Sequence, residues 1–201
     1  MNVKLLGEDM YRLRDLFTIE EINCIMDEFN EYYPSVRKKE KSNEIVDYFE
    51  SLQKGPHSLG DSMTFISLSV KIDIAIRKTL RPKVPLYLQR INTNIMHPGQ
   101  NSDFHNDAPL IEDPSDPDNY VRAYTWTFLL FCSPTWNTQW GGEFCMQTGD
   151  KDYQYASYIP GDGILFRASR SHKGCGPNTT SPRARHSVAW TYVADVPCAD
   201  Y

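Results

Sequence analysis

The sequence predicts one α+β domain that is mainly β, with helices in the first part of the chain and strands in the rest. Before residue 83, apolar residues recur twice at helical spacing. From residue 84 onward, short runs of aromatic and β-branched residues alternate with glycine, proline and polar turns. A chain of 201 residues is long enough for one substantial core. We therefore expect residues 1–83 to form a mainly helical support and residues 84–201 to form a β-rich core.

The first helix is predicted to begin at Thr18. Its hydroxyl can cap the helix, Glu21 can complete a capping box, and Phe17 is placed for a hydrophobic staple. Pro34 is expected to end the helix, because proline disrupts a helix interior. One face of this helix is apolar: Ile22, Ile25, Met26 and Phe29.

A longer helix is predicted over residues 62–80, with Arg81-Pro82 closing it. Both helices are expected to pack on a sheet, because each has one apolar face. Between them, the spacing of Ile45, Phe49 and Leu52 indicates a further helical turn. The apolar face of the longer helix carries Phe65, Leu68, Ile72 and Ile76.

The second part of the chain is predicted to hold six strands. The His-Pro-Gly-Gln sequence at 97–100 forms a turn after the first of them. Residues 111–119 carry two prolines and four acids, and we expect a mobile polar loop there. The predicted strands cover residues 86–96, 120–132, 143–147, 153–159, 164–167 and 185–193.

Composition narrows the class of protein. A net charge of -5 argues against binding to a phosphate backbone, so a nucleic-acid partner is not expected. The five cysteines lack metal-finger spacing and indicate free thiols in a reducing compartment. No secretory leader and no apolar run of membrane-spanning length is recognisable in the sequence. We therefore expect a cytoplasmic protein without a membrane association.

Three residues form a candidate metal site. His105 and Asp107 are two positions apart, so on an extended strand their side chains share one side. His172 follows a glycine-flanked apolar strand at 163–166 and is a candidate for the third ligand. Two histidines and one carboxylate make a facial triad, which binds Fe(II) and leaves coordination positions open.

The order of these motifs resembles the Fe(II)/2-oxoglutarate-dependent dioxygenases, in the branch that includes prolyl 4-hydroxylases. It runs from His-x-Asp through Gly141-Gly142 and a strand to His172 and a final Arg-x-Ser strand. The resemblance covers most of residues 84–195 and, more loosely, the N-terminal helices. It implies a double-stranded β-helix, or jelly roll, as the catalytic core, with the N-terminal helices packed against it. It also implies Fe(II), 2-oxoglutarate as cosubstrate and O2, and it allows ascorbate as a further cofactor.

The resemblance further implies an anchor for the far carboxylate of 2-oxoglutarate. An arginine offers a two-pronged donor suited to a carboxylate, and Arg185 is the candidate, with Ser187 on the same face of its strand. Arg183 is the rival, but it follows Pro182 and is expected in a turn. Arg185 lies farther beyond His172 than in many relatives.

Three more residues are candidates for contact with the cosubstrate. By analogy with the family, Thr127 faces the inside of the barrel, while Tyr124 packs outward against the helices; the opposite strand parity would place Tyr124 in the pocket instead. His97 stands where relatives have a tyrosine before Pro-Gly, near 2-oxoglutarate, and a hydrogen-bonded turn histidine is an equal alternative. His186 points away from Arg185 and is expected to be structural.

The resulting hypothesis is a dioxygenase that hydroxylates an unactivated C–H bond and releases succinate and CO2. Asp107 favours hydroxylation, because a related halogenase site would lack the carboxylate. A prolyl or other peptide residue is one substrate, and a free amino acid or small metabolite is the alternative. A cupin-like metal protein without oxygenase activity is a different class, which would not need Arg185 and Ser187. We also expect residues 111–119 to border the site and to become ordered when substrate binds.

Overall fold

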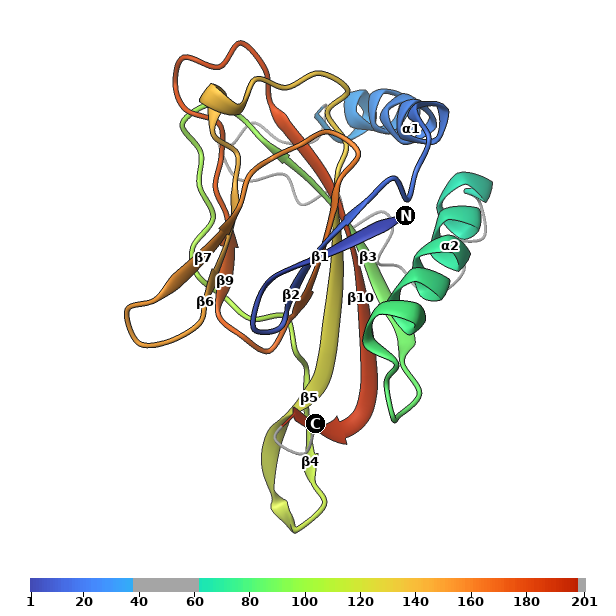
Figure 1. Ribbon diagram of the computed structural model, residues 1–201, viewed down its shortest axis with the longest axis vertical. Helices are drawn as coiled ribbons and strands as arrows, with labels where there is room; N and C mark the ends of the chain where they lie inside the picture. The colour runs from blue at the N-terminus through green and yellow to red at the C-terminus, as the bar shows by residue number, and fades with distance from the viewer. Residues whose placement is uncertain (38–61, 199–201) are drawn as a thin grey trace.

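The computed structural model describes residues 1–37 and 62–198 and contains two antiparallel sheets and two long helices. Figure 1 shows the helices on one side of the large sheet and the small sheet on the other side. The helices are α1 (Ile19–Arg37), α2 (Met63–Leu80) and the 3-10 turn η2 (Thr138–Trp140). The first strands are β1 (Asn2–Gly7), β2 (Met10–Arg14), β3 (Tyr87–Met96), β4 (Leu110–Asp113) and β5 (Asp116–Phe131). The later strands are β6 (Phe144–Gln147), β7 (Tyr153–Ala156), β8 (Gly163–Arg167), β9 (His172–Gly174) and β10 (Arg185–Pro197).

The large sheet has seven strands in the order β1-β2-β8-β5-β10-β3, with β4 paired to β5. The small sheet has three strands in the order β7-β6-β9. All the strand pairs are antiparallel. The prediction of a mainly β protein with packing helices is therefore confirmed.

The large sheet has a core on each face. Along β5, Trp126, Phe128 and Leu130 pack against the helices, whereas Leu129 and Phe131 pack toward the small sheet. Side chains alternate across a strand, so one strand contributes to both cores. Thr127 therefore lies on the face of β5 toward the small sheet, and Tyr124 lies on the face toward the helices, as expected.

Helix α1 begins as its capping box predicts. The Thr18 backbone N–H donates to the Glu21 carboxylate at 2.8 Å, and the Glu21 N–H donates to the Thr18 hydroxyl at 3.3 Å. The helix continues through Pro34 to Arg37, so the predicted end was wrong. A proline inside a helix removes one backbone hydrogen bond and lowers the stability of the helix, but the helix can continue beyond it.

Helix α2 agrees with its prediction over almost its full length. Ser62 caps the first turn by accepting from the Phe65 N–H at 3.2 Å. Arg81 ends the helix in the left-handed conformation, and its N–H bonds to the Arg77 carbonyl. The four predicted face positions are all buried. The helical turn suggested around Phe49 lies outside the described residues.

The first fourteen residues correct the prediction of a mainly helical N-terminal part. They form a hairpin of β1 and β2, and β2 pairs with β8 inside the large sheet. Met10 and Leu13 are buried, and so is Arg12, whose Nη1 lies 3.2 Å from Asp162 Oδ2. Arg12 interrupts the apolar alternation of this strand, because its charge is paired with Asp162 only in the folded protein. The strand was therefore not recognised in the sequence.

Residues 111–119 are a hairpin rather than the predicted loop. Strand β4 pairs with the start of β5, and the Asp113 carboxylate accepts from both the backbone N–H and the hydroxyl of Ser115 at the turn. Figure 1 shows the hairpin projecting from the body of the molecule. An exposed hairpin needs no apolar face, so its polar composition did not indicate strands.

No helix among the described residues has both the length and the apolar character needed to cross a membrane.

Candidate metal centre

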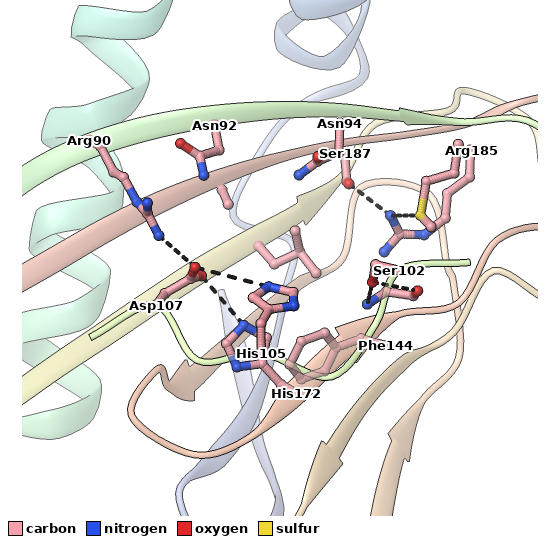
Figure 2. Close-up of a pocket in the computed structure, with 14 residues that line it drawn as sticks. Arg90, Asn92, Asn94, Ser102, His105, Asp107, Phe144, His172, Arg185 and Ser187 are labelled. Atoms are coloured by element: carbon pink, nitrogen blue, oxygen red, sulfur yellow. Dashed lines mark hydrogen bonds and ion pairs between the residues drawn. The ribbon is translucent and has the colours of Figure 1, made fainter. Parts of the chain in front are cut away.

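The structure brings His105, Asp107 and His172 together. One ligand atom from each of the three lies within 4.8 Å of the others, and they are the one such group in the described residues. His172 Nε2 is 3.4 Å from Asp107 Oδ2, and His105 Nε2 is 4.0 Å from Asp107 Oδ1. Figure 2 shows the three side chains converging. Two imidazoles and one carboxylate at this spacing fit a single divalent ion such as Fe(II).

His105 does not lie on the extended strand that was predicted. It forms an isolated bridge with His172, in which the His105 N–H donates to the His172 carbonyl at 3.0 Å and the His172 N–H donates back at 2.8 Å. The Asp107 N–H donates to the Ala168 carbonyl at 2.9 Å. The ligand segment is therefore fastened to the chain around β9, and this pairing places its side chains.

A glycine permits the close approach of the two segments. A Cβ atom at Gly176 would overlap the backbone carbonyl of Gln100, so only glycine fits without a shift of the chain. Asn101 pairs with Cys175 next to this contact. The segment that starts at His172 thus begins with the short strand β9 and supports the ligand segment.

Both histidines present the same nitrogen to the candidate ion. His105 Nδ1 lies 2.9 Å from the Asp103 carbonyl, and His172 Nδ1 lies 2.8 Å from the Arg170 carbonyl. A carbonyl can only accept a hydrogen bond, so each Nδ1 carries the proton. Each Nε2 therefore faces Asp107. With a proton it donates to the carboxylate, and without one it offers its lone pair to a metal ion, as second-shell bonds commonly arrange for metal-binding histidines.

Asp107 is held in its charged form. Burial alone would raise its pKa, but a hydrogen bond from His172 and the charges of Arg90, His172 and His105 outweigh burial and lower the pKa from 3.8 to about 2. Arg90 Nη2 is 2.6 Å from Asp107 Oδ1. A carboxylate that stays ionised at neutral pH is suited to bind a metal cation.

The sequence interpretation missed Arg90. Arg90, Asn92, Asn94 and Met96 occupy alternate positions on β3, and all four line the cavity of about 330 Å³ that contains the metal site. The sequence did contain a signal for this side of the cavity. Polar residues occupy alternate positions of the predicted strand at 86–96, so they share one face of it.

Arg185 lies at one end of the same cavity and is only 2% exposed. Its Nε donates to the Gly142 carbonyl at 2.9 Å, and Nη1 donates to Ser187 Oγ at 2.9 Å and to Met96 Sδ at 3.7 Å. Burial lowers the pKa of Arg185, because the charged guanidinium loses hydration there. Its Nη2 is buried and has no hydrogen-bond partner among the described residues. A buried cation with an unused donor fits a carboxylate that enters the cavity.

The other candidates for cosubstrate contact do not line this cavity. Thr127 faces inward, but its hydroxyl bonds to Thr191 at 3.2 Å, and Thr191 in turn contacts Arg90. Tyr124 faces outward and stacks its ring under Arg167. His97 is exposed in its turn, where its backbone N–H donates to the Gln100 side chain.

His186 is half-buried with a ring nitrogen 3.5 Å from the Ser133 hydroxyl, in agreement with the expected structural role. Burial lowers its pKa from 6.5 to about 4. The unfolded chain binds this proton near pH 6.5, whereas the folded protein binds it only near pH 4. Lowering the pH through this interval is therefore expected to reduce the unfolding free energy, by on the order of 1–3 kcal/mol.

Urea unfolding of the metal-free protein at about pH 7 and about pH 5 checks this expectation. The stability difference between the two conditions should shrink in His186→Gln. An unchanged difference in the variant would assign the pH dependence to other groups.

Comparison with known proteins gives a match in structure but not in sequence. No family model matches the chain, and no curated protein matches it. Among solved structures, a Pseudomonas putida prolyl-4-hydroxylase has a TM-score of 0.62 at 12% identity, over 94% of this chain and 93% of that one. The viral collagen prolyl hydroxylase of Paramecium bursaria chlorella virus-1, in its 2OG complex, has a TM-score of 0.62 at 14% identity, over 94% and 98%.

A third neighbour is HygX from Streptomyces hygroscopicus with nickel and 2-oxoglutarate bound, which has a TM-score of 0.61 at 13% identity, over 92% of this chain and 81% of that one. HygX has also been solved with iron bound. The chain thus shares its fold with these prolyl hydroxylases and with HygX. Prolyl 4-hydroxylases are among its structural neighbours, as the sequence resemblance indicated.

Proposed function

We propose that this protein is an Fe(II)- and 2-oxoglutarate-dependent dioxygenase, built on a double-stranded β-helix, that hydroxylates an unactivated C–H bond. One observation carries the proposal: the His105, Asp107 and His172 cluster shares a cavity with the buried, incompletely bonded guanidinium of Arg185. A metal site alone has no need of such a cation. A dicarboxylate cosubstrate does, because a buried carboxylate needs a paired charge.

The chain's own residues bind and orient in this scheme. His105 and His172 would hold Fe(II) through Nε2, and Asp107 would supply the negative ligand. Arg185 would anchor the far carboxylate, with Ser187 fixing the guanidinium through its 2.9 Å hydrogen bond. Apolar walls, including Leu129 and Phe144, would limit the entry of water. Bound there, Fe(II) and 2-oxoglutarate would supply the oxidation of the substrate by O2, with release of succinate and CO2.

Two substrate classes follow from the neighbours. A prolyl or other peptide residue is favoured by the likeness to prolyl hydroxylases. A free amino acid or small metabolite is the second candidate, and HygX has been solved with hygromycin B, a small molecule, bound. A cupin-like metal protein without oxygenase activity is disfavoured, because it gives no role to Arg185.

Succinate release tests the proposal. The protein, loaded with Fe(II) and supplied with 2-oxoglutarate, O2 and ascorbate, is expected to form succinate, and to form it faster when a peptide or metabolite pool contains the substrate. His172→Ala should abolish this release, because the variant lacks a metal ligand. If the native protein neither binds 2-oxoglutarate nor forms succinate, the metal protein without oxygenase activity becomes the better conclusion.

A further inference from the structure

The cavity contains a second arginine, at the end opposite Arg185. Arg90 and Met96 lie six positions apart on β3, which is about 20 Å at the usual rise of a strand. Arg185 is paired with Met96 across the sheet. Figure 2 shows Arg90 and Arg185 on either side of the candidate metal ligands. A short dicarboxylate that bridges the metal and Arg185 therefore leaves the Arg90 end of the cavity for another ligand.

Arg90 is only partly engaged by the protein. Its Nη2 lies against Asp107 Oδ1, and its Nε contacts Thr191 Oγ1 at 3.5 Å. Within the described part of the chain, Nη1 has no hydrogen bond. The side chain is 30% exposed, so a ligand in the cavity can reach it. A guanidinium can bind Asp107 and a second anion at once, because its donors point in several directions.

The charge of the cavity favours an anion. Its charged lining residues are Arg90, Asp107 and Arg185, which together leave one positive charge. This step rests on the proposed function: Fe(II) adds two positive charges and 2-oxoglutarate removes two. One positive charge remains in the loaded cavity, at the end where Arg90 lies, and a carboxylate would neutralise it.

A neutral polar group lies next to Arg90. Asn92 Oδ1 is buried, lines the cavity on the same face of β3, and has no hydrogen-bond partner among the described residues. A buried acceptor without a donor is costly, so the ligand is expected to bring an N–H or O–H group. Asn94 continues this polar wall toward Arg185.

We propose that Arg90 and Asn92 form the substrate-recognition site, and that the substrate is a small carboxylic acid with an N–H or O–H group close to its carboxylate. A free or N-acylated amino acid has this chemistry. Arg90 binds the carboxylate, and Asn92 accepts from the neighbouring donor. An internal prolyl residue of a peptide has neither the charge nor, at its own nitrogen, the donor.

The test uses the protein loaded with Ni(II) and 2-oxoglutarate, which does not turn over. A panel of N-acetylated amino acids, each paired with its primary amide, is titrated and followed by the paramagnetic broadening of the probe's NMR signals. The best acids are expected to bind about tenfold or more tightly than their amides, because a charge-assisted hydrogen bond is lost in each amide. Arg90→Gln should abolish the preference for acids, and Arg90→Lys should retain part of it.

Arg183→Gln is the matched control. Arg183 is exposed in a turn, where Nη1 donates to Thr135 Oγ1, and its loss should leave the preference for acids intact. Equal binding of acids and amides by the native protein would overturn the proposal. So would a preference that survives Arg90→Gln, or an end-blocked prolyl peptide that binds more tightly than any acid and independently of Arg90.

A second arm separates this proposal from the proposed function. The acid and amide pairs are titrated into the protein loaded with Ni(II) alone, in the native form and in Arg185→Gln. A preference for acids that depends on Arg90 and survives Arg185→Gln supports the recognition site even if 2-oxoglutarate fails to bind, an outcome that would overturn only the proposed function. A preference that disappears in Arg185→Gln and persists in Arg90→Gln would overturn the recognition site.

Discussion

Replacing Arg185 with alanine should lower the affinity for 2-oxoglutarate by roughly a hundredfold or more and leave metal binding intact. Arg185 is buried, and its Nη2 has no partner in the described structure, so an entering carboxylate would complete its hydrogen bonding. Breaking a buried ion pair by removing one partner costs about 3–5 kcal/mol. Such a loss corresponds to a fall in affinity of at least a hundredfold.

An anaerobic titration of 2-oxoglutarate into the Fe(II)-loaded protein, followed by the metal-to-ligand absorption band, measures this affinity. Arg185→Met is a useful companion variant, because it keeps an unbranched apolar side chain and removes only the guanidinium, whose Cζ lies 5.6 Å from the ring centre of Phe131 and 5.5 Å from that of Tyr158. Arg183→Ala should bind 2-oxoglutarate normally, because its side chain contacts Thr135 in an exposed turn. Normal binding by both Arg185 variants would remove the basis for assigning 2-oxoglutarate to this cavity.

Asp107→Ala should weaken Fe(II) binding by at least about a hundredfold and abolish turnover. The substitution removes the one anionic ligand of the cluster. It also removes the carboxylate that lies 2.6 Å from Arg90 Nη2. The guanidinium of Arg90 would then face the metal cation without its anionic partner. Two positive charges that face each other in a partly buried site repel strongly.

Metal affinity can be measured directly by titration with Fe(II) under anaerobic conditions. Asp103→Ala is the matched control, because Asp103 is exposed in the same segment and supports His105 only through its backbone carbonyl. The control should bind metal like the native protein. A metal-loaded structure with the ion on residues other than His105, Asp107 and His172 would contradict the site itself.

The fold could be predicted where local signals and tertiary packing agree. Capping at Thr18, the buried face of α2 and the parity of β5 all follow from spacing and burial, and all were predicted. The N-terminal hairpin and the β4 hairpin were not predicted, because their outer strands β1 and β4 each pair on one side only and lack a regular apolar alternation. Strand β2 also buries Arg12 beside Asp162, a pairing that only the folded chain creates.

The site divides in the same way. Residue type and order were enough to select His105, Asp107 and His172, although their geometry comes from a bridge between segments rather than from one strand. Arg90 was not selected, because the sequence does not show which residue an arginine within a strand will contact. Its contact with Asp107 depends on where the folded chain places the ligand segment relative to β3, and no spacing in the sequence specifies that.

The bridge between His105 and His172 also has a consequence for entropy. It joins positions 67 residues apart, since 172 minus 105 is 67, through two reciprocal backbone hydrogen bonds. The cost of closing a loop grows with the logarithm of its length, and here that cost is met when the chain folds. An arriving ion therefore finds two of its ligands already gathered. A chelator should be able to withdraw the ion without unfolding the chain, so that metal exchange becomes a local event whose rate depends on access to the cavity.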